Sequence, residues 1–319
     1  KVLLAMSGGT DSSVAALLLK EQKYNILGMT FSSHESTSKA CMEKETGCCN
    51  IDSIFEAKKL ANELGFEHKI LDIRKLFNDT IIKDFVNEYM SGLTPNPCVL
   101  CNKIVKWGKM IEEADNLNCD YLATGHYAQV ILENGRYFIR KGSDETKDQS
   151  YFLWKLTQEN LARTIFPLGN LTKSEVREIA RKNKYEKFAN KKESQEICFI
   201  PDNDYRKFLR QRVPDIDKTI GEGNFIDTNG KIIGKHKGYP FYTIGQRKGL
   251  EIAMGYPVYV LNIDSKTNTI TLGNSEQLLK SEVWINTINF MKFPDILEEM
   301  HAICKIRYNN KGEECTVRQ

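Results

Sequence analysis

The chain has 319 residues, more than one compact domain usually holds, so we expect two or three domains. Its 41% hydrophobic and 27% charged residues are typical of a soluble globular protein, and its net charge of +3 is too small to indicate a nucleic-acid partner by itself. No run approaches the roughly 20 apolar residues of a membrane helix. We therefore expect no membrane association, and a cytoplasmic location because no secretory or transit segment is visible.

Strand-like and helix-like segments alternate in the first 200 residues. The predicted strands cover residues 2–6, 24–30, 67–71 and 121–125, and the predicted helices cover residues 14–19, 52–64, 75–90 and 104–117. A further helix is predicted after Thr172, because Thr172 and Glu175 have the spacing of a capping box. This alternation predicts an α/β fold with a doubly wound parallel sheet and a ligand site at the carboxyl ends of its strands.

Antiparallel structure is predicted in two other parts of the chain. Residues 130–140 indicate a hairpin, with Asn134 and Gly135 in its turn. After residue 201, short β-like runs separated by turns cover residues 224–227, 231–234, 258–263, 269–273 and 301–308. They favour either a small sheet domain followed by a barrel or one larger β unit.

The loop at residues 7–13, Ser-Gly-Gly-Thr-Asp-Ser-Ser, follows the first strand and opens the first helix. Backbone N–H groups and hydroxyls at a helix N-terminus favour a bound phosphate. No Gly-Lys-Ser/Thr closes the loop as in a Walker A motif, and the third glycine of a dinucleotide-binding loop is missing. The pattern resembles the loop of the PP-loop ATP pyrophosphatases, which cut ATP between its α- and β-phosphates. An ordinary strand-to-helix turn is the alternative.

Nine cysteines and no export signal predict a reducing compartment in which some thiols are reactive. Cys98 and Cys101 precede the helix expected from about residue 104, where a helix N-terminus would favour the thiolate of Cys101. With the remote Cys198 they predict either a dithiol relay or three ligands of a cluster. We expect packing or incidental roles for the remaining six, which are Cys41, Cys48, Cys49, Cys119, Cys304 and Cys315.

A basic run lies near residue 187. Residues 181–192 contain a single acidic residue, Glu186, and six basic residues, which are Arg181, Lys182, Lys184, Lys187, Lys191 and Lys192. Such a run is usually a solvated helix face, and it becomes a candidate for contacts with a nucleic-acid backbone only with other support.

Motifs along nearly the whole chain resemble the MnmA family of tRNA-specific 2-thiouridylases. They are Ser-Gly-Gly-Thr-Asp-Ser-Ser at 7–13, Thr-Pro-Asn-Pro at 94–97 with Cys-Asn-Lys at 101–103, Ala-Thr-Gly-His-Tyr at 123–127, Lys-Asp-Gln-Ser-Tyr-Phe-Leu at 147–153, Glu-Ile-Cys-Phe-Ile at 196–200 and Thr-Ile-Gly-Gln-Arg-Lys-Gly-Leu at 243–250. The resemblance implies ATP-dependent thiolation at C2 of the wobble uridine of tRNA, through adenylation of its oxygen. It also implies a sulfur-donor relay protein as partner, and we expect a monomer.

The resemblance implies three domains and a role for particular residues. A PP-loop catalytic domain would cover residues 1–200, a central β-rich domain residues 201–265, and an incomplete C-terminal β-barrel residues 266–319. The implied ATP-binding residues are Ala5, Met6, Ser7, Gly8, Gly9, Thr10, Asp11 and Ser12, with Phe31 near the adenine and Gly125 beside the nucleotide. Asp11 would act through Mg²⁺ on the departing pyrophosphate.

The implied sulfur and tRNA sites use residues from the later motifs. Cys198 would carry a persulfide, and Cys101 would be the nucleophile paired with it in a transient disulfide. Asn96, Pro97 and Cys98 would border the target base. The implied tRNA contacts are His126, Lys147, Asp148, Gln149, Arg307 and Tyr308. An anticodon-loop base can be flipped into such a pocket, whereas a base in a duplex could not reach it.

Cys98 departs from the aspartate that we expect at this position in many members of the family. Thiolates of Cys98, Cys101 and Cys198 could hold a [4Fe–4S] cluster with one open iron, to which a hydrosulfide would bind. Zinc on the same ligands, or a dithiol pair with Cys98 as a bystander, are the alternatives.

Two other classes of function compete with this interpretation. One is another PP-loop ligase that adenylates a small molecule, which would have no need of the three cysteines. The other is a non-catalytic, redox-sensing RNA-binding protein, which the intact residues 7–13 disfavour.

Overall fold

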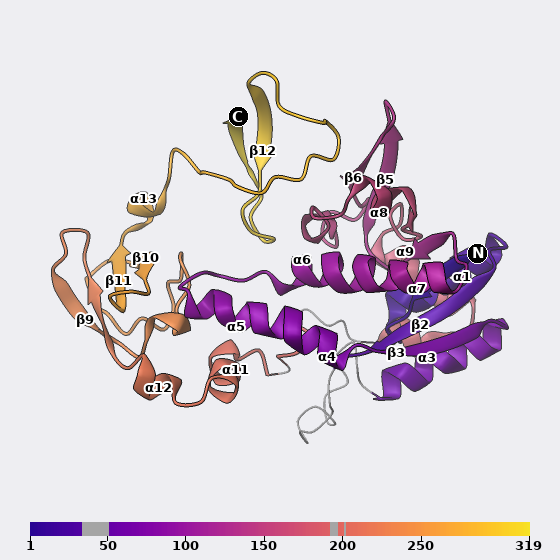
Figure 1. The fold of residues 1–319 in the computed structure, drawn as a ribbon, viewed down its shortest axis with the longest axis horizontal. Coiled ribbons are helices and arrows are strands. Elements are labelled where there is room, and N and C mark those ends of the chain that lie inside the picture. The colour runs from indigo at the N-terminus through magenta and orange to yellow at the C-terminus, as the bar shows by residue number, and fades with distance from the viewer. Residues whose placement is uncertain (34–50, 192–196, 201) are drawn as a thin grey trace. The chain divides into compact units, whose positions relative to one another are not determined.

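The computed structural model describes residues 1–33, 51–191, 197–200 and 202–319, which form two compact units (Figure 1). Unit 1 contains residues 1–73, 98–194 and 287–319, and unit 2 contains residues 74–97 and 195–286. Cys41, Cys48 and Cys49 lie outside the described residues.

Unit 1 is built on a five-stranded sheet in the order β3-β2-β1-β4-β7, with every neighbouring pair parallel. Its strands are β1 (Val2–Ala5), β2 (Ile26–Ser32), β3 (Glu67–Asp72), β4 (Tyr121–Ala123) and β7 (Thr164–Ile165). Val2 of the middle strand pairs with Ile26 on one side and with Tyr121 on the other. The predicted parallel α/β sheet is therefore confirmed.

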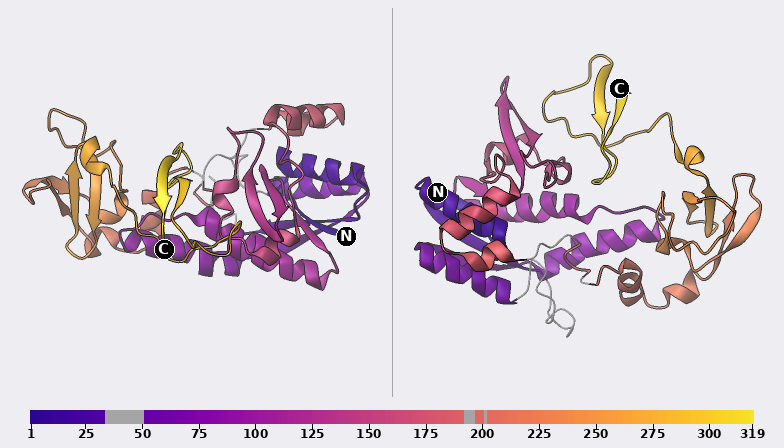
Figure 2. Two further views of the ribbon diagram at one scale, coloured as in Figure 1. Left: turned by 90° about the horizontal axis from the view of Figure 1, so that it is seen from above. Right: turned by 180° about the vertical axis from the view of Figure 1, so that it is seen from behind.

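Helices cover both faces of this sheet, because the strand residues are apolar on both sides. On one face Leu4 packs with residues of α1 (Thr10–Glu21), α3 (Ile51–Leu64), α9 (Lys173–Lys182) and α10 (Glu186–Asn190). Helices α1 and α9 lie side by side (Figure 2). On the other face Leu3 packs with Trp107, Met110 and Leu161, which belong to a long helical run and to α8 (Gln158–Ala162).

The long helical run of unit 1 covers residues 97–116 without a break. It consists of α6 (Pro97–Cys101), a π-helical stretch η2 (Asn102–Lys109) and α7 (Met110–Asn116). The predicted start near residue 104 is wrong, since the helix begins at Pro97. Proline is favoured in the first helical position, where its missing N–H costs no hydrogen bond and its φ is already helical.

Two antiparallel pairs and a short helix complete unit 1. Strands β5 (Ala128–Glu133) and β6 (Arg136–Lys141) form the predicted hairpin. Asn134 and Gly135 have φ values of 51° and 75°, as a two-residue hairpin turn requires. After η3 (Ser150–Phe152), the last pair is β12 (Met300–Cys304) with β13 (Glu313–Val317). The strand predicted over residues 301–308 thus ends at Cys304.

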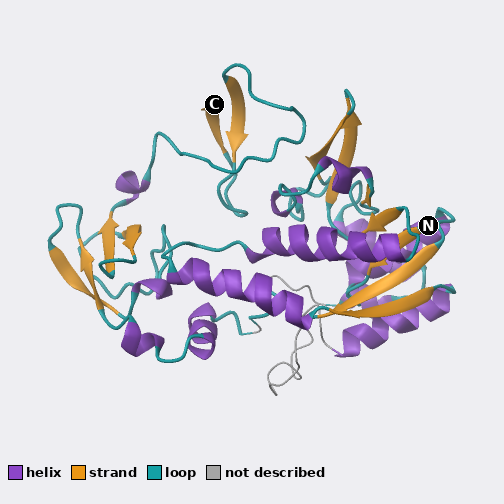
Figure 3. Ribbon diagram, in the orientation of Figure 1, coloured by secondary structure: helices purple, strands orange, loops and turns teal. Residues whose placement is uncertain are grey.

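Unit 2 combines helices with a four-stranded sheet, which Figure 3 colours separately. Its first helical run is α4 (Arg74–Phe77), η1 (Asn78–Ile82) and α5 (Lys83–Met90), and the later helices are α11 (Tyr205–Arg212), α12 (Ile216–Thr219), η4 (Tyr239–Phe241) and α13 (Ser275–Leu278). The sheet has the order β10-β11-β8-β9, from β8 (Gly223–Ile226), β9 (Ile232–His236), β10 (Tyr259–Asp264) and β11 (Thr269–Gly273). Phe85 of α5 packs edge-on against Phe199 and Phe208.

The predicted domain limits at residues 200 and 265 stay predictions. Strands β10 and β11, which lie on either side of residue 265, pair in one sheet. Among the described residues, no helix is long and apolar enough to cross a membrane.

Candidate active site

The loop of residues 7–9 leaves the carboxyl end of β1 and leads into α1. Strand β1 has β2 on one side and β4 on the other, so the chain changes its winding direction at β1. A sheet of this type binds ligands at such a point, beyond the carboxyl ends of the strands. The loop after β4, which carries Gly125, leaves the same edge of the sheet. The predicted nucleotide-binding residues of these two loops are therefore brought to one place.

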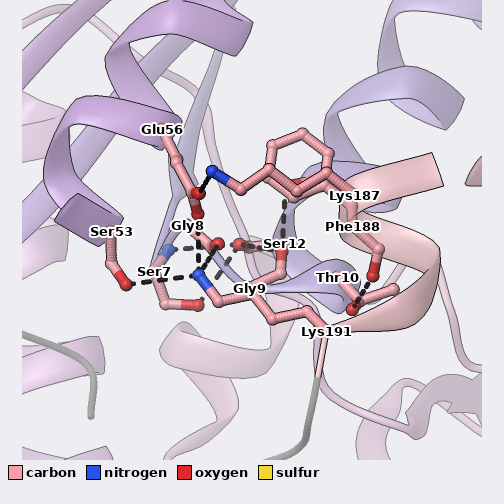
Figure 4. Close-up of polar contacts among 11 residues, drawn as sticks. Ser7, Gly8, Gly9, Thr10, Ser12, Ser53, Glu56, Lys187, Phe188 and Lys191 are labelled. Carbon is pink, nitrogen blue, oxygen red and sulfur yellow. Dashed lines mark hydrogen bonds and ion pairs between the residues drawn. The ribbon is translucent and has the colours of Figure 1, made fainter. Parts of the chain in front are cut away.

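Hydrogen bonds inside the loop fix its shape (Figure 4). The N–H of Ser7 donates to Ser12 Oγ at 3.1 Å, and the hydroxyls of Ser12 and Ser13 donate to the carbonyl of Gly9 at 3.2 and 2.9 Å. The hydroxyl of Thr10 donates to the carbonyl of Phe188 at 2.5 Å. Several hydroxyls predicted to face a phosphate thus stabilise the loop itself, which leaves the N–H groups of the first turn of α1 as donors.

Two glycines in this site allow close approach of neighbouring backbones. Gly8 has a φ of +66°, and a Cβ there would lie 2.1 Å from the carbonyl oxygen of Ser53 in α3. A Cβ on Gly125 would lie 2.9 Å from the carbonyl carbon of Asp11. Any side chain at either position would displace the loop.

Asp11 accepts two hydrogen bonds on one carboxylate oxygen. Lys173 Nζ lies 2.7 Å and the Tyr127 hydroxyl 2.8 Å from Asp11 Oδ1. Lys173 and Tyr127 are buried, with exposed fractions of 8% and 3%. Neither contact was predicted from the sequence, although both residues lie in predicted segments: Tyr127 ends the Ala-Thr-Gly-His-Tyr motif, and Lys173 is the first residue of the capped helix α9.

The predicted sulfur-handling residues are divided between the units. Cys98 and Cys101 lie one turn apart on α6 of unit 1, and Cys198 lies in unit 2. Because α6 begins at Pro97, Cys98 lies in the first turn, where the helix dipole favours a thiolate. The prediction that Cys101 occupies this position is therefore wrong. In the described ranges, no three His, Cys, Asp or Glu side chains form a group that could hold a metal ion.

The predicted tRNA contacts include residues that the structure places together. The ring of Tyr308 lies 4.7 Å from that of Phe152, and burial raises its pKa, with the nearby charge of Asp148 acting in the same direction. Residues 147–149 and 307–308 therefore adjoin within unit 1. Asp148 is buried and accepts hydrogen bonds from the N–H groups of Gly142 and Ser150, while Gln149 accepts one from the N–H of Tyr127.

His126 is buried beneath the surface instead of projecting from it. Lys106 Nζ lies 3.2 Å from its Nε2, and the hydroxyl of Thr124 lies 2.6 Å from its Nδ1. Because an ammonium group only donates, Nε2 accepts and Nδ1–H donates to Thr124. Burial, together with the charge of Lys106, holds the pKa of His126 well below its usual range. Its predicted contact with tRNA stays a prediction.

Other predicted site residues lie at the ends of elements. Ala5 ends β1, Phe31 lies near the carboxyl end of β2, and both are partly buried. Asn96 precedes Pro97, which begins α6.

Comparisons with known proteins match the chain to enzymes that act on tRNA. The family model described as the tRNA methyl transferase HUP domain matches residues 1–202, and the tRNA methyl transferase PRC-barrel domain matches residues 206–274. A tRNA-specific 2-thiouridylase MnmA of Amoebophilus asiaticus is 49% identical over 320 residues, covering 100% of this chain and 85% of the relative. Proteins of the same name from Cytophaga hutchinsonii and Salinibacter ruber are 48% and 49% identical, covering 100% and 99% of this chain and 87% and 83% of the relatives.

Proposed function

The chain belongs to the MnmA family of tRNA-specific 2-thiouridylases, and we propose that its loop at residues 7–9 binds the ATP that activates the tRNA. The family gives the reaction class: the protein is an ATP-using tRNA sulfurtransferase. The target in this proposal is the wobble uridine of the anticodon loop. The observation that carries the assignment of the site is the convergence of the β1 and β4 loops on Asp11 at the switch point of the sheet.

ATP binds through its phosphates in this proposal, with residues Ala5 to Ser12 and Gly125 around the nucleotide and Phe31 at the adenine. The N–H groups of the first turn of α1 donate to phosphate oxygens, and the helix dipole favours the negative charge. The missing side chain of Gly125 allows the two loops to approach each other closely at Asp11. The C2 oxygen of uridine attacks the α-phosphate, pyrophosphate leaves, and the oxygen becomes part of a good leaving group, AMP.

Asp11 fits the role of a Mg²⁺ ligand. Magnesium in nucleotide sites is usually held by one or two carboxylates and the phosphates themselves. A carboxylate has about four acceptor positions, and Asp11 uses Oδ1 for Lys173 and Tyr127. When bound, Mg²⁺ would neutralise charge on the departing pyrophosphate. Lys173 meanwhile holds the carboxylate in place and adds a buried positive charge at the same end of the loop.

Sulfur transfer is assigned to Cys198 and Cys101. A relay protein loads Cys198 with a persulfide, and the terminal sulfur attacks C2 of the activated uridine while AMP leaves. The Cys101 thiolate then attacks the Sγ of Cys198, the sulfur–sulfur bond breaks, and 2-thiouridine and a Cys101–Cys198 disulfide result. A dithiol reductant restores both thiols.

A [4Fe–4S] cluster on Cys98, Cys101 and Cys198 is the alternative sulfur carrier. Cys98 and Cys101 lie one turn apart on α6 and could supply two of its ligands, and Cys198 would supply the third. Iron analysis after anaerobic reconstitution compares wild type with Cys98→Ser. Thiolation by iron-free wild type supports the dithiol route, and iron bound by wild type but lost in the variant supports the cluster.

The tRNA is proposed to contact the surface where residues 147–149 adjoin Arg307 and Tyr308. His126 is a further proposed contact, and Asn96, Pro97 and Cys98 would border the flipped base. Lys305 lies 5.2 Å from the ring centre of Tyr308, so this surface combines positive charge with aromatic rings. Both features favour an RNA loop with unstacked bases. We propose a monomer that works in the cytoplasm, where its tRNA substrate is found.

Mass spectrometry of tRNA nucleosides tests the proposed function. The protein is incubated with tRNA, ATP and a persulfide donor, and 2-thiouridine is expected only when all three are present. Thiolation without ATP, or ATP cleavage to ADP instead of AMP and pyrophosphate, would overturn the proposal. A small-molecule ligase would release pyrophosphate without tRNA.

A further inference from the structure

Lys191 belongs to the basic run near residue 187, a pattern typical of a solvated helix face, but its side chain connects the loop of residues 7–9 with helix α3. It follows α10, and its ammonium group donates to the carbonyl of Gly8 at 3.0 Å, to Glu56 Oε2 at 2.7 Å and to Ser53 Oγ at 3.4 Å (Figure 4). These contacts use the three N–H groups of a lysine. The side chain is 20% exposed, so the ammonium is held and partly shielded from water.

Glu56 provides the negative charge that holds this ammonium. Its side chain is 15% exposed and pairs with both Lys187 and Lys191. Burial alone raises the pKa of Glu56, but the hydrogen bonds from the two lysines outweigh burial, so the pKa lies below its ordinary value. An ionised carboxylate at this position would repel a polyphosphate on the loop if the lysines did not balance it.

The bond from Lys191 to Gly8 also fixes the direction of a peptide unit. The Gly8–Gly9 peptide is planar and trans, so its carbonyl and its N–H point in opposite directions. With the Gly8 carbonyl held by Lys191, the N–H of Gly9 must point away from Lys191. Gly8 itself has a φ of +66°, and a glycine has little intrinsic preference for one backbone conformation, so the contact with Lys191 helps to define the orientation of this peptide.

We propose that Lys191 is a positioning residue for ATP binding, which orients the Gly8–Gly9 peptide so that the N–H of Gly9 faces the phosphates. Glu56 is its counter-ion. The proposal rests on the proposed function of the loop as the ATP site. Lys191 would therefore act in the ATP-dependent activation of the uridine, and this role is independent of how the sulfur is carried.

Steady-state kinetics of tRNA-dependent pyrophosphate release test this role. Lys191→Met is expected to raise the KM for ATP about 10-fold, the size of one lost charge-assisted hydrogen bond, with the KM for tRNA unchanged. Lys191→Arg, which can still donate to both Gly8 and Glu56, is expected to recover most of the affinity. Lys187→Met is the matched control, because it removes a charge from the same carboxylate through a side chain that is 80% exposed. Its KM for ATP is expected to change by less than about twofold.

A double variant separates positioning from charge balance. Lys191→Met with Glu56→Gln removes both charges but does not restore the bond to Gly8, so the KM for ATP is expected to stay raised. Full recovery in the double variant would reduce Lys191 to a counter-ion and overturn the proposal. An unchanged KM in Lys191→Met, with an unchanged unfolding temperature, would overturn it as well. If Asp11→Asn also leaves pyrophosphate release unchanged, the loop is not the ATP site and the proposed function fails. If Asp11→Asn lowers release and only Lys191→Met leaves the KM for ATP unchanged, the positioning role of Lys191 alone fails.

Discussion

The ammonium of Lys173 lies 2.7 Å from the carboxylate of Asp11, 162 residues away along the chain. Lys173 is the first residue of α9, and Asp11 lies in the first turn of α1, so the packing of these two helices brings the charges together. The hydroxyl of Tyr127 donates to the same oxygen. The carboxylate of Asp11 is thus held by two hydrogen bonds that do not depend on a bound ligand.

Lys173→Met should lower tRNA-dependent pyrophosphate release by about 10- to 100-fold, the range for a lost hydrogen bond between charged groups. The physical reason is that Asp11 would keep its hydrogen bond from Tyr127 but would face the phosphates without the compensating positive charge of Lys173. Lys182→Met is the control, since Lys182 pairs with Glu178 on the exposed side of the same helix. An equal loss in both variants would indicate damage to α9 and not to the site.

Asp11→Asn should remove most pyrophosphate release while the protein stays folded, because an amide cannot hold a metal as a carboxylate does. Release is measured with saturating tRNA, and folding by the unfolding temperature. Near-normal release by a folded variant would contradict the proposed role of Asp11.

Cys198→Ser should abolish formation of 2-thiouridine while ATP-dependent activation of the tRNA continues, because adenylation needs no thiol. Pyrophosphate and nucleosides are measured in the same reaction. Cys315→Ser, on β13, is the control and should thiolate normally. Wild-type thiolation by Cys198→Ser would exclude Cys198 as the sulfur carrier.

Lys147→Ala should weaken tRNA binding and lower the slope of log affinity against log salt by about one, because a phosphate contact releases a counterion. The control is Lys59→Ala, which removes an exposed lysine on α3 that pairs with Glu63. An unchanged slope would show that Lys147 makes no contact with a tRNA phosphate.

The sequence predicted the sheet and the loop because their signals are local. A continuous apolar run before Ser7 defines a strand that is buried on both faces, and Asn134-Gly135 defines a turn. The contacts of Lys173 and Lys191 could not be predicted, since each joins residues more than 130 positions apart and depends on how α9 and α10 pack. A basic residue in an amphipathic helix has the same pattern whether it faces solvent or a buried acid. The burial of His126 was missed for the same reason.

His236 should make the stability of unit 2 depend on pH. Burial lowers its pKa from 6.5 to about 4, outweighing an opposing effect of the Asn268 backbone. The N–H of Gly238 donates to Nδ1 at 3.1 Å, which requires the neutral ring, and the rings of Phe225 and Tyr242 pack against it. Because the folded pKa lies below the unfolded one, the unfolded chain binds more protons as the pH falls through this interval. The contribution of the neutral His236 ring to the free energy of unfolding is therefore fully present above about pH 6.5. It should fall by about 3 kcal/mol as the pH approaches 4.

Denaturant unfolding at pH 7.5 and pH 4.5, with NMR titration of the histidine rings, measures this effect. His126 in unit 1 acts in the same direction, since its pKa is also lowered, so the informative quantity is the difference between wild type and His236→Gln. The variant lacks the titrating group and should lose a smaller part of its stability on acidification. A resonance of His236 that titrates near pH 6.5 would contradict this prediction. The same acid-induced loss of stability in wild type and variant would also show that unit 2 does not depend on a neutral His236.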